Sequence, residues 1–252
     1  MIRLLITFFI TLLSLMMNAQ VKSTFTLGSA VNILDVSMPI QVYVDATKDS
    51  DTIEIVAEKQ EGIDLVRLRQ LGDKLVIDFS STARNTKANN LGKIQVYISQ
   101  KSIEKFSVST VAKVIVEGRL KVDNAILSLD SSSSLTADVT AKTVGINMDS
   151  ASKYTGNITA KTIKVNIDSA AKATVSGDTE NLTVNVDSAG TFDGKELKAK
   201  YVKVEADSMG KAEVYPTESL NAYADSMGKV IYHNTPKEIK KYTDSMGSVK
   251  SK

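Results

Sequence analysis

Hydrophobic and polar residues alternate along most of the chain, and the alternation is most regular in its second half. In a representative segment, Ile163, Val165 and Ile167 alternate with Lys164 and Asn166. A period of two residues is typical of a β-strand with one buried face. The period of about 3.6 residues that marks an amphipathic helix is missing from these segments, which are rich in Val, Ile and Thr. The pattern therefore predicts a protein built from β-strands.

An Asp-Ser pair directly follows each of seven alternating segments. The spacings between successive aspartates of these pairs are 19, 19, 19, 20, 18 and 19 residues. The aspartates are Asp130, Asp149, Asp168, Asp187, Asp207, Asp225 and Asp244. The serines paired with the last six of them are Ser150, Ser169, Ser188, Ser208, Ser226 and Ser245. A degenerate eighth unit, "FSVSTVAK" (106–113), precedes the others and has Ser109 in the aspartate position.

A unit of about nineteen residues is too short to bury a core of its own, whereas stacked units can bury a continuous one. Small residues or Met-Gly follow each Asp-Ser pair, and this composition favours a turn. We therefore predict an all-β fold, a parallel β-solenoid (β-helix-like) in which residues 107–252 form eight coils. Each Asp-Ser pair would turn one corner of a coil. The final unit has Lys241 and Thr243 where other units are apolar, which suits a terminal cap.

Residues 21–106 lack the repeat but contain alternating segments such as "IQVYVD" (40–45) and "KIQVYIS" (93–99). These segments predict a β-rich N-terminal region. The region is compatible with an antiparallel sheet that caps the rod and also with irregular opening coils. In either case we expect residues 21–252 to form one continuous domain.

The N-terminus has the features of a secretory signal peptide, which we place at residues 1–20. Arg3 supplies a positive charge, residues 4–17 form an apolar run, and Ala19 is a small residue near the expected cleavage site. The apolar run is shorter than the about 20 residues that a membrane span needs, and no later stretch is apolar enough to form one. We therefore expect an exported protein in the periplasm, on the outer-membrane surface or outside the cell.

Charge and composition narrow the classes of partner and activity. The chain has 31 basic and 29 acidic residues, so its charge is nearly balanced. Nucleic-acid-binding proteins normally have a concentrated basic face, so we do not expect nucleic acid as a partner. It has no Cys, no glycine-rich phosphate loop and no pair of histidines, so we expect no cofactor. His233 is the only histidine, and seven equivalent aspartates single out no catalytic pair. No catalytic residue is therefore assigned.

Stacked coils would place the seven aspartates in a column with neighbours about 5 Å apart. Neighbouring carboxylates would repel by about 0.8 kcal/mol in water and by more in protein, so they need hydrogen bonds or counter-charges. Turn N–H groups, serine hydroxyls and lysines four residues further on can supply these, and we favour this structural role. The alternative is a calcium ladder on the same aspartates. Known calcium solenoid repeats are nine residues long and glycine-rich, unlike these, so we assign no metal site.

Three methionines, Met209, Met227 and Met246, occupy the third position of the last three corners. If they face inward, they fill the core at the C-terminal end. If they face outward, they form an adaptable apolar strip for a partner or for self-association. The sequence leaves both directions open, and we expect inward packing because apolar side chains are usually buried.

The corner motifs resemble those of the auto-transporter adhesin, head GIN domain family of bacterial envelope proteins. The matching stretches are "STVAK" (109–113), "DSASK" (149–153), "DSAAK" (168–172) and "DSMGK" (207–211 and 225–229). The resemblance covers nearly the whole chain after residue 20 and implies an exported, solenoid-like all-β protein. It brings no catalytic or ligand-binding residue. Met in the third motif position departs from the small residues that are usual in the family.

These features together favour a non-enzymatic exported β-solenoid that acts as an adhesin-like or cell-envelope interaction module. We expect its partner to be a protein or a polysaccharide of the envelope, because long repetitive faces suit extended ligands. Self-association into a homo-oligomer is also compatible with this fold. Two alternatives stay open, a periplasmic structural or stress-related protein and a carbohydrate-active enzyme.

Overall fold

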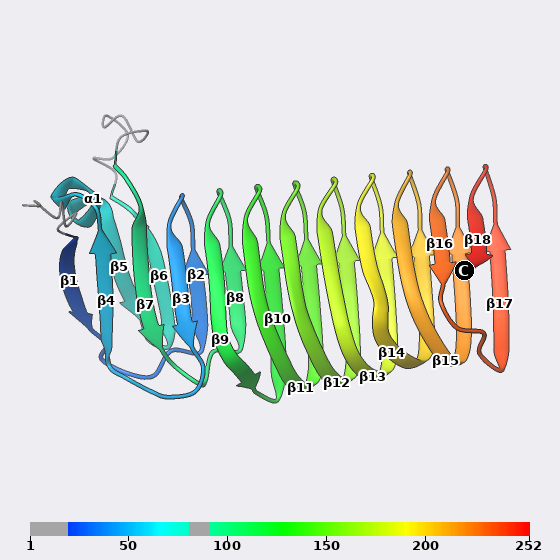
Figure 1. The fold of residues 1–252 in the computed structure, drawn as a ribbon, viewed down its shortest axis with the longest axis horizontal. Coiled ribbons are helices and arrows are strands. Elements are labelled where there is room, and N and C mark those ends of the chain that lie inside the picture. Colours follow the sequence, from blue (N-terminus) through cyan, green and yellow to red (C-terminus); the bar gives the residue numbers. More distant parts are fainter. Residues whose placement is uncertain (1–19, 81–90) are drawn as a thin grey trace, which may run out of the picture.

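The protein is a rod in the computed structural model, which describes residues 20–80 and 91–252 (Figure 1). Residues 1–19 of the expected signal peptide thus lie outside the described residues. Within the described ranges the one helix is α1 (Gln60–Leu65), and no helix combines the length and apolar character needed to cross a membrane. The N-terminal strands are β1 (Val21–Thr26), β2 (Ile33–Val36), β3 (Gln41–Asp45), β4 (Thr52–Ala57), β5 (Val66–Leu71), β6 (Lys74–Phe79) and β7 (Ile94–Ser99). The strands of the repeats are β8 (Lys105–Val108), β9 (Lys113–Lys121), β10 (Asn124–Leu129), β11 (Ser134–Met148), β12 (Lys153–Ile167), β13 (Lys172–Val186), β14 (Thr191–Ala206), β15 (Lys211–Ala224), β16 (Lys229–Tyr232), β17 (Glu238–Thr243) and β18 (Ser248–Ser251).

Successive coils of the repeats pair in parallel, and paired residues are one sequence repeat apart. Ser134 of β11 lies opposite Lys153 of β12, which lies opposite Lys172 of β13. Strands β11 to β14 each run through the lower bend of the rod without interruption (Figure 1). We call the part of a coil that follows a corner its first arm and the part that precedes the next corner its second arm. The predicted all-β parallel solenoid of about nineteen-residue coils is confirmed.

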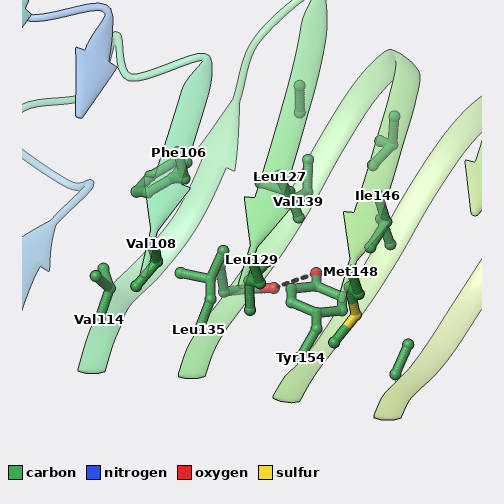
Figure 2. Close-up of a cluster of buried hydrophobic side chains, with 14 of the residues drawn as sticks. Phe106, Val108, Val114, Leu127, Leu129, Leu135, Val139, Ile146, Met148 and Tyr154 are labelled. Carbon is green, nitrogen blue, oxygen red and sulfur yellow. Dashed lines mark hydrogen bonds between the residues drawn. The ribbon is translucent and has the colours of Figure 1, made fainter. Parts of the chain in front are cut away.

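The core of the rod is formed by the inward-facing residues of both arms. In β12 these include Tyr154, Ile158 and Val165, which are all buried. The Tyr154 hydroxyl donates a hydrogen bond to the Ala137 carbonyl oxygen of the preceding coil at 2.8 Å (Figure 2). Burial raises the pKa of Tyr154, so the phenol stays protonated as a donor. This contact satisfies a polar group inside an otherwise apolar core, which burial without a partner would make costly.

The N-terminal region contains both of the arrangements that the sequence left open. Strand β2 pairs in parallel with β6 and β8, and β3 pairs in parallel with β7 and β9. Two opening coils, one of β2 and β3 and one of β6 and β7, therefore precede the repeats. Beyond them β1 pairs with β4, β4 with β7 and β5 with β6, all antiparallel (Figure 1). These outer strands cap the N-terminal end of the rod.

Candidate functional site: the corner column and the polar groove

Each of the seven Asp-Ser corners is a four-residue turn that starts at its aspartate. In the turn that starts at Asp168, Ser169 and Ala170 have φ angles of 50° and 62°. The Ala171 N–H closes this turn by donating to the Asp168 carbonyl oxygen at 3.1 Å. Positive φ at both central residues with this closing bond is the type I′ arrangement. Positive φ recurs at the two central residues of all seven Asp-Ser corners.

The carboxylate of each corner aspartate accepts a hydrogen bond from a backbone N–H that takes no part in the hydrogen bonds between coils. In all seven corners its Oδ1 accepts the N–H of the following serine at 2.5–2.7 Å. The next N–H along the turn instead donates to the following coil, as Ala170 does to the Ser188 carbonyl oxygen at 3.1 Å. A short carboxylate therefore caps the turn locally. The structure places all seven aspartates and their serines in this one column of corners.

Hydrogen bonds favour the ionised form of two carboxylates in this column, those of Asp149 and Asp225. The Ser169 hydroxyl, followed by Ser150, lowers the pKa of Asp149. The Ser226 N–H lowers the pKa of Asp225, although burial acts in the opposite direction. In the part of the chain that the structure describes, no group of three or more His, Cys, Asp or Glu side chains is arranged to hold a metal ion. The geometry therefore adds nothing in favour of the calcium ladder.

Replacing one corner aspartate tests its capping role. We expect Asp168→Ala to lower the Tm by about 2–4 °C, because the Ser169 N–H loses its acceptor at 2.6 Å. Asp168→Asn keeps a side-chain oxygen and should retain most of the stability. Thermal unfolding followed by circular dichroism measures both variants. An Asn variant as unstable as the Ala variant would show that the charge, and not the acceptor, is what the corner needs.

The expectation that the corner methionines pack into the core is wrong. The exposed fractions are 59%, 53% and 81% for Met209, Met227 and Met246. The third turn position points out of the rod in these coils, and the fourth position faces the core. Ala171 is buried at the fourth position of one corner. Gly228 occupies the fourth position of another corner. A Cβ on Gly228 would overlap the Ala206 carbonyl oxygen of the preceding coil, so no side chain fits there.

An open groove of about 540 Å³ runs beside the corner column on the second arms. Four corner aspartates line it, and so do outward-facing residues located two positions before a corner. No Lys, Arg or His belongs to the lining of this groove. The lining includes the polar residues Asp130, Asp149, Asp168, Asp187, Ser107, Ser109, Ser128, Asn147, Asn166 and Asn185 and the apolar residues Val108, Leu129, Met148 and Ile167.

Three asparagines form a hydrogen-bonded ladder along this groove. Asn166 Nδ2 donates to Asn147 Oδ1, and Asn185 Nδ2 donates to Asn166 Oδ1, both at 2.9 Å. The ladder was not predicted from the sequence. Its signal is nevertheless visible there, because Asn recurs two residues before three successive corner aspartates. Identical amides in register can bond along the rod, as the cross-strand pairs of a sheet do.

The one histidine belongs to a separate charged cluster near the start of the first arms. His233 Nε2 lies 2.7 Å from Glu213 Oε2, and Lys211 Nζ lies 2.7 Å from Glu213 Oε1. The hydrogen bond from Lys211 lowers the pKa of Glu213 to about 2, with a further contribution from His233 and against the effect of burial. Glu213 therefore forms an ion pair with Lys211 and a hydrogen bond with the His233 ring.

Comparisons with known structures support the fold. A structure described as a "putative adhesin" from Parabacteroides distasonis has a TM-score of 0.83 at 20% identity, over 92% of this chain and 97% of that one. A structure described as a "putative adhesin" from Parabacteroides merdae has a TM-score of 0.80 at 15% identity, over 92% of this chain and 96% of that one. A structure described as a "putative lipid binding protein" from Parabacteroides distasonis has a TM-score of 0.80 at 17% identity, over 92% of this chain and 96% of that one. At these identities the likeness concerns the fold alone.

The sequence itself identifies the family. No curated protein matches the chain significantly. A family model described as "Putative auto-transporter adhesin, head GIN domain" matches residues 32–236, which span the opening coils and nearly all of the repeats. The resemblance inferred from the corner motifs is thereby confirmed. The chain belongs to this head GIN domain family.

Proposed function

We propose that the protein is an exported, non-enzymatic, adhesin-like module of the bacterial cell envelope. The observation that carries this proposal is the repetition of one surface along the rod, the column of corners, with the groove beside the corners from Ser109 to Asp187. A long surface that presents the same groups at each coil suits contact with an extended partner. The family description and the signal-peptide features of residues 1–20 support the adhesin-like role and the export.

The uniformity of the corners argues against catalysis. Acid–base chemistry requires two titratable groups whose environments separate their pKa values. The corner aspartates share one turn conformation and one backbone contact at each coil. Where the environments of two of these carboxylates differ, at Asp149 and Asp225, the pKa is lowered, which favours the ionised form and not the raised pKa of a general acid.

Surface labelling of intact cells tests the proposed location. We expect a membrane-impermeant amine reagent to label exposed lysines such as Lys164 and Lys240 on intact cells of the bacterium that makes the protein. A periplasmic control protein should stay unlabelled in the same sample, and mass spectrometry reads both. Labelling of this chain only after the outer membrane is opened would contradict an adhesin-like role and favour the periplasmic structural alternative.

A further inference from the structure

The outward column that contains the asparagine ladder continues in register along the whole repeat region. Each member pairs with the next across parallel strands that are about 4.8 Å apart. Toward the C-terminal end its chemistry changes from amides to one carboxylate and two aromatic rings. In chain order the column consists of Ser107, Ser128, Asn147, Asn166, Asn185, Glu205, Tyr223 and Tyr242.

We propose that this column and the corner aspartates beside it form a binding track for an extended, uncharged polysaccharide. The inference rests on the proposed adhesin-like function and names the ligand class of that function. Four features carry it, namely the spare hydrogen-bonding capacity of the ladder, the charge of the groove, the exposed tyrosines and the engaged backbone of the strands.

The ladder retains hydrogen-bonding groups for a ligand. An Asn amide has two N–H donors and an oxygen with two lone pairs. Asn166 uses one N–H toward Asn147 and one lone pair toward Asn185, so one donor and one acceptor site remain. A sugar hydroxyl both donates and accepts, and a row of hydroxyls can therefore bond to a row of amides. The corner carboxylates add strong acceptors along the same line.

The charge of the groove selects against acidic chains. Its lining includes four carboxylates and no basic side chain. Lys164 and Lys203 lie in the neighbouring outward column and do not line the groove, although Lys203 pairs with Glu205 of the track at 2.8 Å. A uronate or sulfated polysaccharide in this groove would place its anions against the aspartates without a counter-charge. An uncharged chain meets no such repulsion.

The C-terminal part of the track offers aromatic rings. Of the ten large hydrophobic residues that are exposed in the described chain, six lie between Tyr201 and Met246. Tyr223 and Tyr242 are 38% and 56% exposed and occupy adjacent positions of the column. The Tyr223 hydroxyl donates to Asp225 Oδ2 at 3.1 Å, which restrains the ring. A restrained, amphipathic ring can pack against the C–H face of a sugar at low entropic cost.

The engaged backbone makes a peptide a poorer occupant than a polysaccharide. Peptides commonly bind to sheets by adding a strand to an open edge. Strand β17, which carries Tyr242, pairs with β15 on one side. Along the rest of the track, strands β10 to β15 already bond to a neighbouring coil on both sides. Only side chains are available there, and they repeat from coil to coil. A ligand that itself repeats matches this arrangement, whereas the surface of a folded protein does not.

Affinity electrophoresis of the full exported chain tests the track directly. The gels contain hydroxyethyl cellulose, glucomannan or galactomannan as uncharged probes, and alginate as an acidic probe. We expect at least one uncharged probe to retard the protein and alginate to leave its mobility unchanged. The double variant Tyr223→Ala/Tyr242→Ala and the single variant Asn166→Ala should each weaken the retardation about tenfold. Thr155→Ala, on the first arm, should behave as the wild type, and Tm values confirm that all variants are folded.

Three results would each overturn the track: mobility unchanged by all three uncharged probes, equal retardation by alginate, or retardation that the tyrosine and asparagine variants do not weaken. Binding of the fluorescently labelled wild-type chain to intact bacterial cells separates this inference from the proposed function. Cell binding without retardation by any of the uncharged probes would leave the adhesin-like function in place and point to a protein partner. Absence of both would contradict both proposals.

Discussion

Replacing Gly156 with Ala should lower the free energy of unfolding by about 3 kcal/mol. Gly156 lies in β12, two residues after the buried Tyr154. A Cβ on Gly156 would overlap the Ala137 carbonyl oxygen of the preceding coil and would lie 2.5 Å from the Tyr154 hydroxyl oxygen. The methyl group would therefore separate two coils and break the hydrogen bond between Tyr154 and Ala137. Urea unfolding followed by circular dichroism measures the loss.

Gly145 provides the matched control for this substitution. It lies in β11, and the nearest atom to a Cβ built there is the Ala125 carbonyl oxygen at 4.0 Å, an ordinary contact distance. We expect Gly145→Ala to change the free energy of unfolding by no more than about 0.5 kcal/mol. If Gly156→Ala were equally mild, the close packing of coils around Tyr154 would be contradicted. A large loss in both variants would show that the strands reject any added side chain.

The fold of the repeats could be predicted from the sequence because hydrogen-bonded residues of successive coils are separated by one sequence repeat. A residue and its hydrogen-bonded partner in the next coil occupy the same place in successive units, as Asn147 and Asn166 do. Alternation then decides which side chains are buried. The position of the corners followed from the turn-forming composition around each Asp-Ser pair. Local sequence was therefore sufficient for the architecture of residues 107–252.

The direction of the corner methionines depends on backbone angles that their residue types do not indicate. Two consecutive residues other than glycine adopt positive φ at each corner, for example Ser208 at 47° and Met209 at 67°. Such values are uncommon outside glycine, so no propensity argument would assign them to Met. The turn directs the third side chain outward, and the glycine after it occupies the crowded inward position. Hydrophobicity alone therefore gave the wrong direction.

The opening coils could not be placed from the sequence because their partners are distant and do not repeat. Strand β2 pairs with β8, and Ile33 lies opposite Lys105. Between these two strands the chain forms the outer coil and the antiparallel cap. No fixed period connects the paired segments, so alternation identified strands there without identifying their neighbours. The groove was missed for a related reason, since its volume appears only when the second arms are stacked.

Neutralising Glu213 should remove a pH-dependent part of the stability of the rod. Its side chain is 15% exposed and is held by Lys211 and His233, each at 2.7 Å. The pKa of Glu213 is lowered from 4.5 to about 2 in the folded protein. A carboxyl whose pKa is lower in the folded than in the unfolded state stabilises the fold above the unfolded value, and this contribution is lost as the pH falls through the folded value. We expect Glu213→Gln to cost up to about 3 kcal/mol at pH 7.

The pH dependence separates this effect from a loss of packing. The difference between wild type and Glu213→Gln should shrink as the pH falls from about 4.5 to about 2, because the wild-type carboxyl then becomes neutral as well. Glu218→Gln, in the same strand β15, is the control. Glu218 pairs with Lys237 in a solvent-exposed position, so its loss should matter little at any pH. Urea unfolding of the three proteins at pH 7, 4.5 and 2.5 provides the comparison. A difference for Glu213→Gln that stays constant from pH 7 to 2.5 would mean that the cluster around His233 stabilises the rod through shape. A difference that falls to about a quarter of its pH 7 value at pH 2.5 assigns the effect to the ionised carboxylate.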